Sequence, residues 1–322
     1  MNAHIKNISF YVPEQIITND DLSKLMNTSD EWIRTRTGIQ QRHSVGTQNI
    51  GPADLATKAA EKLLKKCQLN KDEIDFVIFA TSTPDYYVPG SGAIFQDKMG
   101  LNTVGVLDIR QGCSGFVYAL SVADQFIKSQ TYKNILVIGA EVQTTQLDFD
   151  DAGRGTAVLF GDGAAAALVC PTNENKGILS FHLHSEGKYV DQLGTEYPSS
   201  KYKDIISPEN VKNRQHHIHM NGREVFKHAV RRFPEAILEA LEHNNMSLDD
   251  VDLVIPHQAN KRITQAVQKK LNISENKIFS NIHKYGNTTA ASIGIALTEA
   301  LEENKIQNGD IVVLAAFGAG FQ

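Results

Sequence analysis

A helix, turn and strand pattern occurs twice in this chain, and it limits the possible folds more than any other feature. LKKCQLNKDEIDFVI, beginning at Leu64, reads as the end of an amphipathic helix, a polar turn and a buried strand, and LEHNNMSLDDVDLVI repeats it from Leu241. NILVIGAE, beginning at Asn134, is matched in the same way by DIVVLAAF, beginning at Asp310. The two offsets, from 64 to 241 and from 134 to 310, are nearly equal, which favours two related halves over chance similarity.

In both halves, helical patterns separate short β-branched runs, so the predicted fold class is α/β. We expect two mixed sheets packed through shared helices, with halves spanning 1–172 and 173–322. A site would lie where loops of both halves meet. TAVLF, from Thr156, is expected to be a further strand of the first half, without a counterpart after IVVLAAF. Two independent domains on a linker fit less well, because the midpoint has no Pro-, Ser- or Gly-rich stretch.

The charge and cysteine content exclude several classes. A net charge of −5, with Lys and Arg spread along the chain, argues against a nucleic-acid partner. The first residues lack the apolar core of a signal peptide, and no apolar run approaches the ~18 residues of a membrane span, so we expect a cytoplasmic protein with no membrane partner. The three cysteines form no CxxC pair, which argues against a disulfide framework or a cysteine zinc site.

Cys113 is the best candidate nucleophile. It lies in QGCSG, where a strand gives way to an apolar-periodic helix, so its sulfur sits at a helix start. There the helix dipole and unpaired N–H groups favour a thiolate, and the flanking glycines allow close approach of a substrate. The alternative is a small buried hydrophobe, the usual role of a free cysteine. Cys67 and Cys170 fit that structural role better.

Two polar residues of the second half are further candidates. His257 follows the strand DLVIP directly, at a position where α/β proteins commonly place ligand-facing residues. Asn287 lies in a loop entering a helix, which the duplication places opposite the QGCSG turn; alternatively, Asn287 or Thr288 only caps that helix. A Cys, His and Asn in this order also occur in papain-like proteases, but the surroundings of the cysteine and the duplicated α/β pattern fit that class poorly.

The main irregular stretch runs from about Ser185 to His219 and is typical of a lid or binding loop. It contains a histidine group, His216, His217 and His219, but no Cys or carboxylate stands at ligand spacing, so no metal site is predicted. GDG, from Gly161, is a turn signal and not a dinucleotide-binding fingerprint.

Five segments in order, NTSDEWIRTRTGI, RQGCSGF, GRGTAVLFGDGA, HQANKRI and YGNTTAAS, resemble the β-ketoacyl-acyl carrier protein synthase III family over nearly the whole chain. The resemblance implies a thiolase-like fold, usually as a homodimer, and a condensing acyltransferase that starts fatty-acid chains. It implies that Cys113 takes an acyl group from an acyl-CoA as a thioester and that His257 and Asn287 assist condensation with malonyl-acyl carrier protein. No cofactor is implied, since both thioesters are substrates. The backbone N–H groups of Cys113 and Ala319 would hold the oxyanion.

The resemblance also implies roles for residues around the entrance. The residues expected to bind coenzyme A are Trp32, Arg36, Arg154 and Asn260. Those expected to line the acyl pocket are Val88 and Phe226, and those expected to dock the carrier protein are Lys227 and Arg262.

Two departures from the family pattern stand out. Val88 occupies a position that is often a large aromatic in acetyl-specific members, which predicts a primer longer or bulkier than acetyl. The sequence also stops at FGAGFQ, where family members continue with a further strand, so we expect either a truncation or an unusual terminus. Two other classes are open: a synthase III-like enzyme of secondary metabolism that condenses or transfers another acyl group, and a non-catalytic subunit, which would not need an intact Cys, His and Asn.

Overall fold

A five-stranded mixed sheet forms the centre of the molecule in the computed structural model, which describes residues 1–322. Its strands, in spatial order, are β1 (Asn2–Tyr11), β7 (Gly163–Thr172), β6 (Ile135–Glu141), β4 (Phe76–Ala80) and β5 (Gly105–Ile109). β4 is parallel to both β5 and β6, whereas β7 runs antiparallel to β6 and β1. β4 and β6 are buried along their whole length, which explains why they read as continuous apolar runs.

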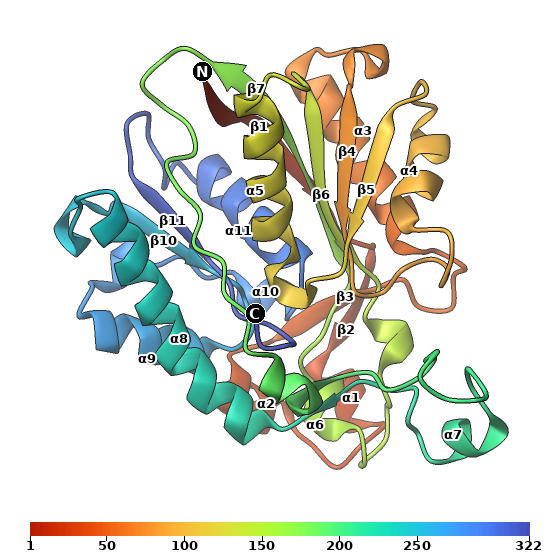
Figure 1. The fold of residues 1–322 in the computed structure, drawn as a ribbon. Helices are drawn as coiled ribbons and strands as arrows, with labels where there is room; N and C mark the ends of the chain where they lie inside the picture. Colours follow the sequence, from red (N-terminus) through yellow and green to blue (C-terminus); the bar gives the residue numbers. More distant parts are fainter.

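Helices cover both faces of this sheet (Figure 1). α3 (Pro52–Cys67) and α4 (Ser91–Met99) pack on one face, and α5 (Gly115–Lys128) and α11 (Ala291–Glu302) pack on the other. α3 begins with Pro52 at its first turn and with the Asp54 carboxylate accepting from the Gly51 N–H, and it ends at Gln68 in a left-handed conformation. Its buried positions, such as Ala56, Ala60 and Leu63, recur at helical spacing.

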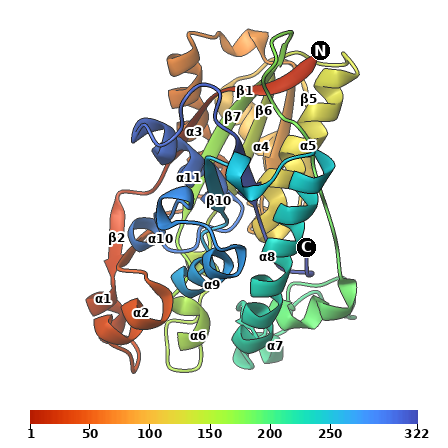
Figure 2. The same cartoon turned by 90° about the vertical axis from the view of Figure 1, so that its left-hand side faces the viewer.

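A second, smaller sheet packs on the other side of α5 and α11. It consists of β10 (Leu253–Pro256) and β11 (Val312–Ala315), which run parallel. Leu253 and Ile255 join the apolar cluster of α5 and α11, whereas Val254 faces α8 (Gly222–His243) and α9 (Lys261–Leu271). The result is a five-layered α/β/α/β/α arrangement in which the central helices serve both sheets (Figure 2).

Short elements surround the ends of these layers. They are β2 (Gln15–Thr18), α1 (Asn19–Ser23), α2 (Asp30–Thr37), β3 (Gln41–Ser44), α6 (Arg154–Ala157), β8 (Leu193–Gly194), α7 (Pro208–Lys212), β9 (His219–Met220) and α10 (Ile282–Tyr285). None of the helices is long and apolar enough to cross a membrane.

The repeated sequence pattern folds into the same local structure twice. α3, a 3₁₀ turn (Lys71–Glu73) and β4 follow one another in the first half, and α8, a 3₁₀ turn (Leu248–Asp250) and β10 do so in the second. Two details differ from the expectation. The second sheet has only two strands, both parallel. The strand predicted for TAVLF is wrong, because Thr156 and Ala157 belong to α6 and only Phe160 forms an isolated bridge, to Asn287.

Candidate active site

Cys113 lies in a 3₁₀ turn (Gly112–Ser114) that connects β5 to α5 and is buried. Gly112 has φ +50°, a left-handed conformation that suits glycine, and this bend brings the chain from the strand into the helix. The C-terminal turn FGAGF packs directly against the cysteine, since a Cβ at Gly318 would lie 2.9 Å from the Cβ of Cys113. Ser114 Oγ also donates to the carbonyl of Gln322, beside the lower end of α5 in Figure 1.

The cysteine is a thiol at neutral pH, contrary to the expected thiolate. Burial raises the pKa of Cys113 to about 12, and the negative charge of Glu141 adds to this shift. The N–H groups of Cys113 and Ala319 favour the thiolate, but their effect is smaller than the cost of burying a charge. A nucleophilic Cys113 therefore needs a base when it reacts.

His257 directly follows Pro256, the last residue of β10. Its backbone N–H donates to Ala315 O at 2.7 Å. Its Nδ1 lies 2.6 Å from Ser292 Oγ, whereas Nε2 is buried and has no partner. Burial lowers the pKa of His257 to about 3, so the imidazole is neutral at pH 7. Because a hydroxyl can donate or accept, Ser292 is compatible with either neutral tautomer, and Nε2 can act as an acceptor or as a donor.

Asn287 is held at both its backbone groups and its side chain. Its N–H donates to Leu159 O at 2.8 Å, and its carbonyl accepts from Gly161 N–H at 3.0 Å. Its Oδ1 accepts from the N–H of Thr289 at 2.9 Å, so the amide nitrogen Nδ2 is left as a donor without a protein partner.

The structure places the turns that carry these three residues next to one another, and the turns come from both halves of the chain. Ala290, three residues after Asn287, meets the start of α5, where a Cβ at Gly115 would lie 3.4 Å from the Ala290 Cβ. Ser292, in the first turn of α11, contacts the His257 ring. A buried thiol, an unpartnered imidazole nitrogen and an unpartnered amide nitrogen therefore occupy neighbouring turns, an arrangement suited to acyl transfer through a covalent intermediate.

Trp32, on α2, lies between two guanidinium groups. Arg36 is 4.9 Å and Arg154 is 5.1 Å from the centre of the indole ring. Arg154 also donates to Asn27 O, and Arg262 donates from Nε to Thr35 O at 3.1 Å. A surface hollow of about 390 Å³ opens here, lined by Ser29, Glu31, Trp32, Thr35, Arg36 and Arg262. Its cations and indole suit an anionic ligand with an aromatic ring.

The other residues with predicted roles lie around this entrance or apart from it. Asn260 caps α9, with its side chain accepting from the N–H of Arg262 at 2.8 Å. Phe226 and Lys227 lie on the exposed side of α8, where Lys227 pairs with Glu224 at 3.3 Å. Val88 is 78% exposed and its side chain is not enclosed within its own chain. The histidines of the long loop bond to backbone, His217 to Gln146 O and His219 to Asp191 O.

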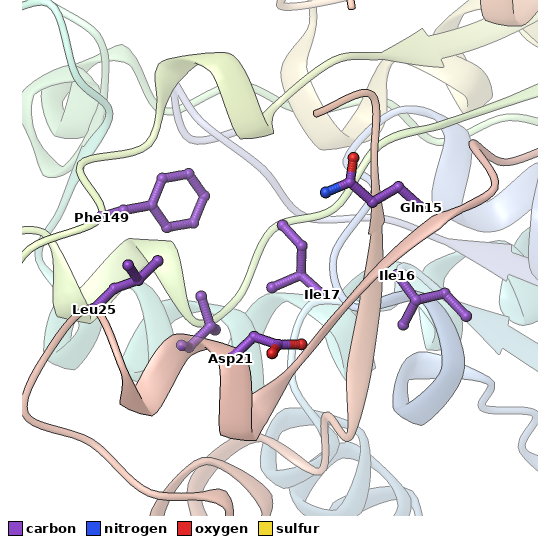
Figure 3. Close-up of a pocket in the computed structure, with 7 residues that line it drawn as sticks. Gln15, Ile16, Ile17, Asp21, Leu25 and Phe149 are labelled. Atoms are coloured by element: carbon purple, nitrogen blue, oxygen red, sulfur yellow. The ribbon is translucent and has the colours of Figure 1, made fainter. Parts of the chain in front are cut away.

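A second hollow, of about 420 Å³, shares no lining residue with the first (Figure 3). It is formed by β2, α1 and the side chain of Phe149, and five of its seven lining residues are hydrophobic. Its only charged side chain is Asp21, which pairs with Lys24. It contains no nucleophile, so we do not assign chemistry to it.

Sequence reasoning missed the polar residues behind the site. Ser292 and Thr289 lie in TTAAS, a run of small residues that gave no sign of a role for either of them, and Gln143 lies in a turn after β6. Glu141 did carry a signal, because it is a charged residue that ends an otherwise apolar strand.

Comparison with known proteins identifies the family. The family model described as 3-oxoacyl-[acyl-carrier-protein (ACP)] synthase III matches residues 107–187, and its C-terminal counterpart matches residues 241–322. The chain is 47% identical over 318 residues to the β-ketoacyl-[acyl-carrier-protein] synthase III of Clostridioides difficile strain 630, covering 99% of this chain and 95% of that protein. The chain belongs to the 3-oxoacyl-[acyl-carrier-protein] synthase III family.

Other synthase III proteins agree with this assignment. The protein of Listeria monocytogenes serotype 1/2a strain 10403S is 44% identical over 320 residues, covering 99% of this chain and 96% of its own. The crystal structure of the synthase III of Aquifex aeolicus VF5 matches with a TM-score of 0.90 and 42% identity, over 99% of this chain and 97% of that one. The predicted family and its thiolase-like α/β fold are therefore confirmed, and the chain is a condensing acyltransferase.

Proposed function

We propose that this synthase III starts fatty-acid chains by decarboxylative Claisen condensation, with Cys113 as the acyl carrier and His257 and Asn287 as the donors. The observation that carries the proposal is the meeting of a buried thiol with two unpartnered side-chain nitrogens, His257 Nε2 and Asn287 Nδ2. The expected alternative in secondary metabolism is not favoured, because relatives with 42–47% identity over full length are synthase III enzymes.

In the first half-reaction, an acyl-CoA transfers its acyl group to Cys113. The thiol proton passes to His257 Nε2 in its acceptor tautomer, the sulfur attacks the thioester carbonyl, and the coenzyme A thiolate leaves with a proton. The N–H groups of Cys113 and Ala319 stabilise the oxyanion, in keeping with their contacts to the sulfur. Trp32, Arg36 and Arg154 bind the nucleotide end of coenzyme A, with Asn260 beside its pantetheine arm.

In the second half-reaction, malonyl-acyl carrier protein binds. His257, now in its other neutral tautomer with the proton on Nε2, and Asn287 Nδ2 donate to its thioester carbonyl. The C–C bond to the carboxylate breaks, carbon dioxide leaves and the electron pair becomes an enolate. The enolate carbon then attacks the acyl group on Cys113, the C–S bond breaks and the 3-oxoacyl product leaves. The Cys113 thiolate takes a proton from water, which restores the thiol. No cofactor is required, because decarboxylation itself generates the nucleophilic carbon. Lys227 and Arg262 would bind the acidic carrier protein.

The proposed state is a cytoplasmic homodimer in which Val88 of one subunit closes the acyl pocket of its partner, beside Phe226. Two features support it. β5 is an edge strand with an unpaired side, and it exposes Leu107. Val88 is a large apolar side chain left 78% exposed by its own chain.

Intact-protein mass spectrometry tests the proposal. Wild type and Cys113→Ala are incubated with acetyl-, butyryl-, isobutyryl- and hexanoyl-CoA. We expect a single acyl adduct on wild type and none on the variant. Absence of any adduct on wild type would overturn the assigned chemistry.

A further inference from the structure

Glu141, at the end of β6, is a carboxyl group with no exposed surface. The N–H of Ser82 donates to its Oε1 at 3.0 Å, and the Thr83 hydroxyl donates to its Oε2 at 2.7 Å. Thr83 Oγ1 also accepts from the N–H of Val142 at 2.9 Å, which leaves its own proton free to donate to Glu141. No lysine or arginine is among its hydrogen-bonding partners. Burial raises the pKa of Glu141, and hydrogen bonds from Thr83, Ser82 and Thr289 oppose that shift by favouring the carboxylate.

Gln143 connects this carboxyl group to the second half of the chain. Its amide nitrogen lies 3.4 Å from Glu141 Oε2, 3.1 Å from Ser82 Oγ and 3.3 Å from Thr289 Oγ1. The opposite orientation of the amide would set two acceptor oxygens against each other, so Glu141 determines which way Gln143 points. The consequence is visible at the other end of the amide, where Gln143 Oε1 is buried without a partner.

Thr289 is a strained residue. Its φ is +45°, in the left-handed region that a β-branched side chain rarely adopts, and it is 3% exposed. Its hydroxyl contacts Gln143, and its N–H donates to Asn287 Oδ1 at 2.9 Å. The strained backbone thus aims this N–H at the Asn287 amide oxygen, which leaves Nδ2 as the outward-facing donor.

We infer that Glu141 is a positioning residue for the condensation step, which acts through Gln143 and Thr289 to hold the Asn287 amide with Nδ2 toward the malonyl thioester. The side chains of Glu141, Gln143 and Thr289 contact one another in turn, and the backbone N–H of Thr289 completes the connection to the Asn287 side chain. The inference rests on the proposed function, because Asn287 serves condensation there and does not take part in the acylation of Cys113. The two half-reactions can therefore be measured separately.

The decisive comparison is Thr289→Val against Thr289→Ser. Both alter the same side chain, but valine keeps its branched shape and loses the hydroxyl, whereas serine keeps the hydroxyl. Acylation is followed by mass spectrometry with acyl-CoA, and condensation by product formation from pre-acylated enzyme and malonyl-acyl carrier protein. We expect condensation in Thr289→Val to fall about tenfold or more, with acylation within about threefold of wild type, and Thr289→Ser to stay within about threefold in both steps.

Glu141→Gln tests the first residue of the connection from Glu141 through Gln143 and Thr289 to Asn287. We expect it to slow condensation by a similar factor and to move the pH profile of Cys113 alkylation by iodoacetamide to lower pH, because a negative charge near the sulfur is removed. Thermal melting checks its folding, and if it does not fold, the Thr289 pair decides.

The inference is overturned if Thr289→Val condenses at the wild-type rate, or if it loses both half-reactions equally. A wild-type enzyme that takes no acyl group would instead contradict the proposed function, so the two failures are distinguishable.

Discussion

His257 Nδ1 lies 2.6 Å from Ser292 Oγ, so only Nε2 of this buried ring can meet a substrate. Both residues belong to the second half of the chain, and their contact holds the ring that the proposed function pairs with Cys113 of the first half.

Ser292→Ala should therefore reduce activity without changing any group that touches a substrate. Loss of the hydroxyl leaves Nδ1 buried and unpaired and removes the contact that holds the orientation of the ring, so we expect kcat to fall about tenfold. Steady-state kinetics measures this. Ser9→Ala is the matched control, because it removes a buried hydroxyl that bonds Ala59 O away from the site; an equal fall in both variants would contradict the role of Ser292.

The rate of acylation should be nearly independent of pH around neutrality. The pKa of His257 is lowered to about 3 and that of Cys113 is raised to about 12. The imidazole gains a proton only below its pKa and the thiol loses one only above its own, so both keep one form in between. We expect kcat/KM for acyl-CoA to vary less than about threefold between about pH 5.5 and 8.5. A fall centred near pH 6.5 would show that the histidine titrates normally.

Trp32 should report the binding of coenzyme A directly, since it is the only tryptophan in the chain. We expect its fluorescence to change on titration with coenzyme A, and Arg154→Ala to weaken binding about tenfold, because one of the two guanidinium groups over the ring is lost. Arg34→Ala is the control, because Arg34 lies on α2 with Trp32 but pairs with Asp30. Equal weakening by both changes would contradict the assigned site.

The side chain at position 88 should set the length of the primer. Wild type is expected to be acylated by butyryl- or isobutyryl-CoA at least as fast as by acetyl-CoA, and Val88→Phe to lose the longer primers by about tenfold or more while keeping acetyl, because a larger side chain fills the pocket. Val190→Phe, at another exposed valine, serves as the control. A strict acetyl preference in wild type would refute the prediction.

A charge on the edge strand should separate the proposed dimer. Leu107→Lys places an ammonium group on β5, and we expect light scattering after size exclusion to show a shift from dimer to monomer. Leu25→Lys alters another exposed leucine, outside this edge, and should leave the mass unchanged. A wild-type monomer would contradict the dimer itself.

The sequence predicted most of the layered fold because its signals are local. The pattern around Leu64 and Leu241 determines a helix, a turn and a strand in each half, whatever surrounds them. The error at TAVLF has a physical reason: β-branched and aromatic residues also suit a buried turn, and here α6 and the Phe160 bridge to Asn287 take their place. The strand that does follow, β7, is rich in alanine and has weak strand propensity.

The same limit applies to the site. Cys113, His257 and Asn287 were recognisable from their motifs, and the structure brings them together. Glu141, Gln143 and Thr289 could not be connected in advance. The contacts of Glu141 with Ser82 and of Gln143 with Thr289 join distant parts of the chain, and the N–H of Thr289 is placed by a strained φ angle. Local patterns show where a reactive group stands, whereas its support depends on the folded chain.

The burial of Cys113 limits which molecules can deliver an acyl group to it. The sulfur is buried, while Trp32 and Arg36 line a surface hollow. Under the proposed function, the thioester carbonyl therefore reaches Cys113 at the end of a narrow, extended arm, and the nucleotide of coenzyme A remains outside. A small free carboxylic acid has no such arm. Under the proposed function, by contrast, coenzyme A and the acyl carrier protein can bind one after the other at the same entrance, because each carries its acyl group on the same kind of narrow arm.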